Sequence, residues 1–139
     1  MLIDEGLELL TEQQCVDLLV SERVGRVGVT IGGLPVILPV NFAYVDGDVV
    51  FRTGEGTKLQ AATRSAVVAF EVDAYDSTEQ EGWSVLLIGR ASAVTDERER
   101  AELDRRGITP WASGPRPRYV RVRPEMITGR RIVGPSALP

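Results

Sequence analysis

Two tight turns between runs of alternating apolar residues constrain the fold of this chain most. Gly32-Gly33 follows the alternating run 24–31, and Asp46-Gly47 separates the runs 34–44 and 48–53. Two-residue turns of this composition match the twist of antiparallel strands and therefore predict β-hairpins. The segment 24–53 is thus expected to form three consecutive antiparallel strands.

The rest of the chain continues this pattern with more strands and a few short helices. Further strands are expected over 66–72, 83–94 and 118–124, with a short one over 127–132, and helices over 12–21, 58–63 and 96–106. About six antiparallel strands with small helices between them predict a mainly β fold that closes into a barrel. A length of 139 residues suits a single domain, 1–139, with a real hydrophobic core.

Two residues inside the expected strands break the regular ladder. Pro39 donates no backbone hydrogen bond, so its strand should be an edge, bulged, or opened at that point. Pro39 is therefore compatible with two interpretations: a plain bulge, or a site where free backbone groups meet a ligand. Gly89, inside the strand 83–94, indicates a bulge or a close approach of another backbone.

The composition excludes several classes of function. The chain has no histidine and one cysteine, which removes histidine-based catalysis, the usual zinc sites and thiolate clusters, so no metal site is expected. A net charge of -4 argues against sequence-independent nucleic-acid binding. Because no apolar run reaches the length of a membrane span and Cys15 cannot form an internal disulfide, a cytoplasmic protein away from membranes is expected. Redox chemistry here would require an organic cofactor.

The segment from Phe51 to Lys58 reads as a strand end, a glycine turn and a helix start. Thr57 is the expected N-cap, with Gln60 completing a capping box. Lys58 then faces the positive end of the helix dipole, where a cation is normally disfavoured. A bound phosphate would reverse this mismatch, with Arg52 as a second cation. The competing interpretation is a solvated ion pair between Glu55 and Lys58.

Two tryptophans and a group of arginines have both structural and functional interpretations. Trp83 begins a strand and is either partly buried or stacked on a ligand ring, and Trp111 in the loop 109–117 should pack on a partner subunit or ligand. Six arginines form a basic zone in the C-terminal part of the chain, at positions 116, 118, 121, 123, 130 and 131. This zone is either a solvated face or a surface that attracts an anionic ligand.

The order and spacing of several segments resemble the pyridoxamine 5'-phosphate oxidase-like family of split β-barrel flavoproteins, which includes flavin and deazaflavin oxidoreductases. The matching segments are Gly25-Arg26-Val27-Gly28, Leu38-Pro39-Val40-Asn41-Phe42, Phe51 to Lys58, Val72-Asp73, and Gly82 to Ala91, within residues 11–95. The resemblance implies a six-stranded antiparallel split β-barrel with short flanking helices.

The resemblance also implies a homodimer with FMN in a groove between the subunits. On this basis the FMN phosphate is expected at Arg52, Thr53, Thr57 and Lys58. The backbone of Leu38, Pro39, Val40 and Asn41 is expected along the edge of the isoalloxazine ring. Trp83 and Ser84 match a strand that contacts the flavin, and Trp111 and Arg121 match residues that reach across the dimer.

The expected function is that of an FMN-dependent oxidoreductase acting on a small molecule, with hydride transfer through the flavin and no catalytic side chain. A deazaflavin-dependent reductase on the same fold is one alternative, and a non-catalytic flavin-binding or sensing module is another. The chain lacks the arginine–histidine arrangement of true pyridoxamine phosphate oxidases, so vitamin B6 chemistry is not expected.

Overall fold

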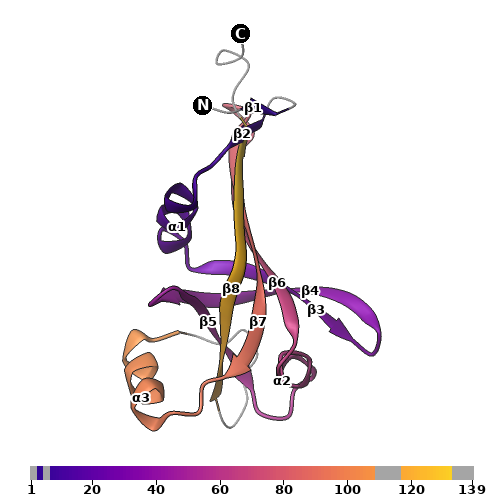
Figure 1. Ribbon diagram of the computed structural model, residues 1–139, viewed down its shortest axis with the longest axis vertical. Helices are drawn as coiled ribbons and strands as arrows, with labels where there is room; N and C mark the ends of the chain where they lie inside the picture. The colour runs from indigo at the N-terminus through magenta and orange to yellow at the C-terminus, as the bar shows by residue number, and fades with distance from the viewer. Residues whose placement is uncertain (1–2, 5–6, 109–116, 133–139) are drawn as a thin grey trace.

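Six antiparallel strands close into a ring in the order β8–β5–β4–β3–β6–β7, with β7 returning to β8 (Figure 1). The computed structural model describes residues 3–4, 7–108 and 117–132. The ring strands are β3 Val24–Ile31, β4 Leu34–Val45, β5 Asp48–Gly54, β6 Val67–Asp76, β7 Glu81–Ala93 and β8 Pro117–Ile132. This ring confirms the predicted fold class, and both predicted hairpins lie at their glycine turns.

Two short N-terminal strands extend the sheet beyond the ring. β1 (Ile3–Asp4) pairs with β2 (Leu7–Leu9), and β2 pairs with the C-terminal end of β8. Residues 1–10 show no clear strand pattern in the sequence, and the strand character of β2 depends on its long-range pairing with β8.

Three short helices flank the barrel at the positions that their caps predict. α1 (Glu12–Val20) starts with a complete capping box between Thr11 and Gln14. α2 (Lys58–Ala62) starts at the N-cap Thr57, and α3 (Glu97–Arg106) lies between the N-cap Asp96 and a left-handed Gly107. Local side-chain to backbone bonds therefore set these boundaries.

The main core fills the ring, and a smaller cluster lies between the ring and α3. Phe42 and Phe70 meet edge to face in the main core, with ring centroids 4.8 Å apart. The smaller cluster packs Leu103 of α3 against Val50 and Tyr119. The apolar run at the start of β6 is not covered on both faces, because Val67 is 55% exposed.

A β-bulge joins the two strands that the sequence predicted over 118–124 and 127–132 into the single strand β8. The β7–β8 register shifts between Ile88 and Gly89, so that Glu125 is the extra residue on β8. A side chain at Gly89 would place its Cβ 2.0 Å from the carbonyl oxygen of Arg123. The bulge and the close approach predicted at Gly89 are therefore both present.

Pro39 lies on an open edge of the barrel, in a ladder without a bulge. The β3–β4 register is continuous, and β5 pairs with β4 only from Phe42 onward. The amide of Phe42 donates to Arg23, so the alternation of an antiparallel ladder directs the backbone groups of Pro39 away from β3. Proline is tolerated there because that edge has no strand partner.

In the described part of the chain, none of the helices has the length and apolar character needed to cross a membrane.

Candidate functional site

β4 and β5 separate after the Phe42–Phe51 pair, and this fork brings together most of the predicted cofactor residues. Before Phe42, β4 pairs only with β3, and after Phe51, β5 pairs only with β8. One side of the fork therefore carries the predicted segment 38–41. The other side carries β5 from Arg52 onward and the turn into α2. The two segments thus border the opening of the fork, where the pairing of β4 and β5 ends.

The turn from β5 into α2 is tightly organised by its own hydrogen bonds. The Thr57 hydroxyl accepts from the amide of Gln60 and donates to the carbonyl of Gly54. The Gln60 side chain accepts from Gly56 at 2.6 Å, instead of from Thr57 as a standard capping box requires. The N-cap prediction is confirmed, and the second half of the capping box is shifted by one residue.

Lys58 is exposed at the first position of α2 and has no ion-pair partner among the described residues. Glu55, its proposed partner, instead accepts from Arg118 Nη2 at 2.7 Å. α2 has only five residues, so its dipole is small, and the electrostatic argument now depends on the lack of a carboxylate partner for Lys58. Lys58 is also the only lysine in the sequence.

Arg52 and Thr53 point to opposite faces of β5, as strand alternation requires. Arg52 Nη1 donates to the carbonyl of Ile108 at 2.9 Å, and its guanidinium lies 5.7 Å from the ring centroid of Tyr119. The Thr53 side chain is buried at 3% exposure. Arg52 therefore interacts with residues of its own chain, and its contact with a phosphate remains a prediction.

Three buried polar atoms at this end of β5 and β8 have no hydrogen-bond partner among the described residues. They are Arg52 Nε, Thr53 Oγ1 and Arg118 Nε. Thr53 and Arg118 are direct partners across the two strands. Arg52 lies on the opposite face of β5, so the two donors that share one face, Thr53 Oγ1 and Arg118 Nε, are the ones that suit an anionic group better than a cation.

Trp83 and Ser84 lie at the opposite end of the barrel wall from α2. They pair with Ala74 and Asp73 of β6, near the N-terminal end of β7, whereas α2 leads into the other end of β6 (Figure 1). Trp83 is half-buried and lines a surface pocket of about 290 Å³ with Tyr75 and Arg131. One copy of the chain does not bring these residues to the fork.

Arg121 is held by carboxylates of its own chain. Its Nε lies 3.2 Å from Asp48, and it also contacts Glu99 of α3. Its proposed role across a dimer remains a prediction. Trp111 lies outside the described residues.

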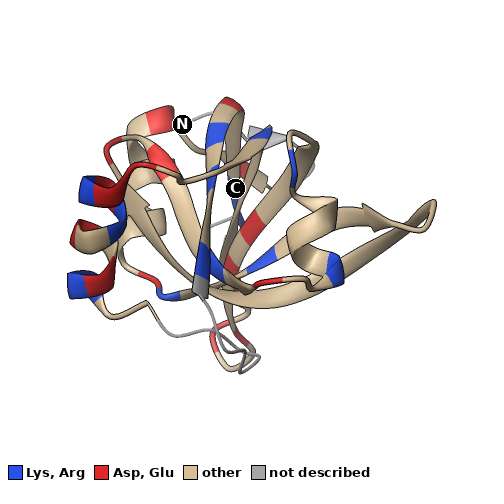
Figure 2. Ribbon diagram, turned by 90° about the horizontal axis from the view of Figure 1, so that it is seen from below, with Lys and Arg blue, Asp and Glu red and all other residues tan. Residues whose placement is uncertain are grey.

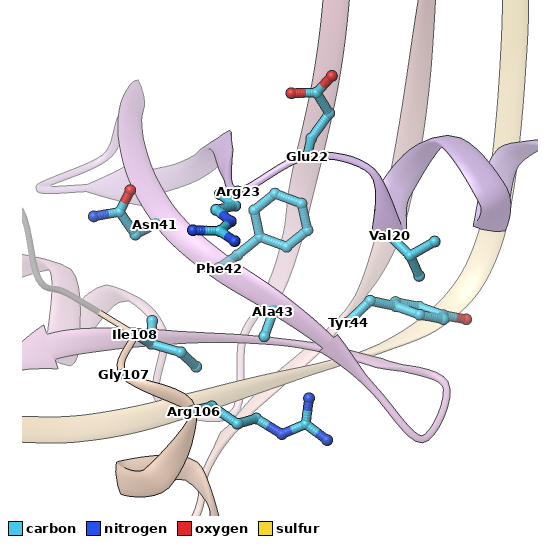
Figure 3. Close-up of a pocket in the computed structure, with 10 residues that line it drawn as sticks. All are labelled: Val20, Glu22, Arg23, Asn41, Phe42, Ala43, Tyr44, Arg106, Gly107 and Ile108. Atoms are coloured by element: carbon cyan, nitrogen blue, oxygen red, sulfur yellow. The ribbon is translucent and has the colours of Figure 1, made fainter.

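A pocket of about 590 Å³ lies beside the fork and includes Asn41 (Figure 3). Its walls come from the end of α1, from β4 and from the end of α3, where Ile108 also accepts from Arg52. The sequence did not identify Arg23, Tyr44 or Arg106 as members of one pocket. Three segments that are far apart in the chain form it, and no local motif marks them.

Two groups near the predicted residues have pKa values well above their usual range. Burial, followed by a hydrogen bond to Asp104, raises the pKa of Tyr119 to about 12. Burial, a hydrogen bond with Asp73 and the charge of Asp73 raise the pKa of Glu71 to about 7, against the opposing effect of Arg26. Arg26 pairs across the sheet with both Glu71 and Pro39, so the Glu71 carboxyl lies two strands from the open edge of β4.

Comparison with known proteins identifies the family. The family model for pyridoxamine 5'-phosphate oxidase matches residues 11–131. The chain belongs to this family. A family relative, the uncharacterized protein Rv0080 of Mycobacterium tuberculosis, is 38% identical over 135 residues, covering 94% of this chain and 88% of Rv0080.

Solved structures of the pyridoxamine 5'-phosphate oxidase fold resemble this barrel closely. The FAD binding protein from Mycobacterium smegmatis is 41% identical with a TM-score of 0.77, covering 89% of this chain and 98% of that one. The conserved protein DIP1874 from Corynebacterium diphtheriae is 34% identical with a TM-score of 0.76, covering 93% and 100% of the two chains.

Proposed function

We propose that this protein is a flavin-dependent oxidoreductase that binds FMN, or a flavin built on it, at the fork between β4 and β5. The observation that carries the proposal is that Lys58 has no ion-pair partner among the described residues, and that Thr53, five residues earlier at the end of β5, has a buried hydroxyl with no hydrogen-bond partner among them. The similarity to a protein described as FAD binding, at 41% identity, supports a flavin as the ligand.

The residues at the β5–α2 turn suit the phosphate end of the flavin. Lys58 would supply the charge, and Thr57 the hydroxyl beside it. Thr53 Oγ1 and Arg118 Nε share one face of the sheet and have no acceptor among the described residues, so a bound phosphate could satisfy donors that the chain leaves unpaired.

The segment 38–41 suits the ring end of the flavin. The outward backbone carbonyl of Pro39 borders the opening, and the amide and carbonyl of Asn41 point in the same direction. Backbone groups of this kind can bond the polar edge of an isoalloxazine ring. When bound, the flavin supplies the redox chemistry through hydride transfer, and the protein's part is to position it and exclude water.

We further propose a homodimer with the flavin at the subunit interface, because Trp83 and Ser84 lie away from the fork. If these residues contact the same flavin as Lys58, a second copy of the chain must supply them. The β3–β4 hairpin offers a surface for such a copy, because it protrudes from the barrel and carries no charged side chain between Arg26 and Asp46 (Figure 2). Its exposed apolar residues include Leu34 at 67% and Ile37 at 72% exposure.

Titration with FMN, followed by the quenching of flavin fluorescence, tests the proposal. Lys58→Ala should weaken FMN binding by about 10- to 100-fold, because a charge-assisted hydrogen bond contributes about 1.5–3 kcal/mol. Arg105→Ala removes the same charge from an exposed position on α3 and should leave binding unchanged. A protein that does not quench FMN fluorescence, or two variants that bind FMN equally, would refute the proposed site.

A further inference from the structure

The pocket of about 590 Å³ beside the fork has an apolar wall that is fixed by the packing of the barrel. This wall consists of Val20, Phe42, Ala43, Tyr44 and Ile108 (Figure 3). Phe42 belongs to the main core and Ile108 to the smaller cluster, and both side chains are buried. Pockets of about 300–1,000 Å³ with mainly apolar walls and a few charged groups are typical sites for small organic molecules.

Three charged side chains complete the lining of this pocket, namely Glu22, Arg23 and Arg106. Arg23 precedes β3 and Arg106 ends α3, so the two cations come from separate elements (Figure 3). Neither arginine forms an ion pair within the described segments, whereas Arg105, the neighbour of Arg106, pairs with Glu102. Two arginines and one glutamate give the described lining a net charge of +1, which favours a ligand with one negative charge.

The pocket lies next to the segment proposed for the ring end of the flavin. Asn41 belongs both to the segment 38–41 and to the lining of the pocket. On the other side of the fork, Arg52 of β5 donates to the carbonyl of Ile108 at 2.9 Å, so the end of α3 is held against β5. A molecule in the pocket would therefore border the segment 38–41.

We propose that this pocket binds the substrate of the enzyme, and that the substrate is an organic acid with one carboxylate and an apolar, ring-containing body. The inference rests on the proposed function and specifies its substrate class. The guanidinium groups of Arg23 and Arg106 would bind the carboxylate, because a guanidinium donates two parallel hydrogen bonds to its oxygens. The ring would pack on Phe42 and Tyr44. A phosphate monoester fits less well, because its charge of about -1.5 to -2 exceeds that of the lining.

Calorimetric titration of the whole chain with 2-naphthoate and with its neutral analogue 2-naphthamide tests the inference. 2-Naphthoate should bind with a Kd below about 1 mM, and 2-naphthamide should bind at least about 10-fold more weakly. 2-Naphthyl phosphate should bind no more tightly than 2-naphthoate. A phosphate that binds about 10-fold more tightly than the carboxylate would overturn the substrate class.

Variants of the charged lining locate the binding site. The double variant Arg23→Gln, Arg106→Gln should weaken 2-naphthoate at least about 10-fold, whereas Glu22→Gln removes the opposing charge and should strengthen it about 3-fold. Arg105→Gln is the matched control and should leave the affinity unchanged, because Arg105 lies outside the lining. These side chains are exposed or half-buried, so the variants should fold. Equal binding of 2-naphthoate to the double variant and the wild type would overturn the pocket.

Quenching of FMN fluorescence in the same variants separates this inference from the proposed function. The variants of the charged lining should change FMN affinity less than about 2-fold. FMN binding without 2-naphthoate binding would overturn the substrate pocket alone. Binding of 2-naphthoate without FMN binding would overturn the proposed function, and with it the role of the acid as a substrate.

Discussion

The close approach at Gly89 provides a sharp test of the barrel geometry. In Gly89→Ala the new Cβ would lie 2.0 Å from the carbonyl oxygen and 2.7 Å from the carbonyl carbon of Arg123. Both are backbone atoms of β8, so no flexible side chain can move aside, and the strands must separate by roughly 1 Å. Overpacking of a well-packed site costs about 1–3 kcal/mol, and disturbed hydrogen bonds of the β7–β8 ladder add about 1 kcal/mol.

We therefore expect Gly89→Ala to lower the free energy of unfolding by about 2–4 kcal/mol, which corresponds to a fall in Tm of roughly 10 °C. Urea denaturation followed by tryptophan fluorescence measures this change. Gly28→Ala is the matched control, because its Cβ would lie 3.5 Å from the Cβ of Ala69, an ordinary contact. That variant should stay within about 1 kcal/mol of the wild type. If both variants unfold at the same urea concentration, the reasoning about the bulge is wrong.

Two further predictions concern pH dependence and assembly. Because the pKa of Glu71 is raised to about 7 in the folded protein, its stabilising contribution is fully present below the unfolded value near 4.5 and is lost as the pH rises towards 7. The difference in unfolding free energy between the wild type and Glu71→Gln should therefore fall between pH 5 and 7. If the unfolding free energies of the two proteins change with pH in parallel, the assignment of this pH dependence to Glu71 is wrong. Ile37→Lys on the exposed β3–β4 hairpin should shift a dimer towards monomer in sedimentation velocity. Val20→Lys changes another exposed apolar residue and should leave the dimer intact. A wild-type protein that sediments as a monomer would rule out the dimer.

The features that the sequence predicts well are those determined by local chemistry. The hairpin turns at Gly32-Gly33 and Asp46-Gly47 and the caps at Thr11 and Asp96 each depend on residues close in the chain. Backbone conformation and side-chain capping there do not need tertiary context, so the residue types suffice to place them.

The features that the sequence does not reveal depend on contacts between distant segments. β2 is a strand because β8 pairs with it, and residues 118–132 form one strand because Glu125 is accommodated as a bulge. The choice of ion-pair partners among the charged side chains also depends on such contacts. Glu55 is three residues from both Arg52 and Lys58, yet it forms an ion pair with Arg118 of the neighbouring strand β8. Charge pairing follows the fold, so sequence spacing alone could not predict it.

The candidate site shows both situations. Thr57 and Lys58 could be placed at a helix start because the cap is local. The position of the segment 38–41 opposite them became visible only once the strand registers were known. The pocket of about 590 Å³ beside the fork combines the ends of α1 and α3 with β4, and its members are too far apart in sequence for any motif to connect them.

Chemical labelling of Lys58 is the most direct test of the central claim that a flavin phosphate binds at the β5–α2 turn. Since Lys58 is the only lysine, an amine-directed reagent modifies one side chain, and mass spectrometry of the peptide that contains it measures the rate. The proposal predicts that saturating flavin slows the modification of Lys58 at least 10-fold, whereas riboflavin, which has no phosphate, protects it little. Modification at the same rate with and without bound flavin would contradict the claim.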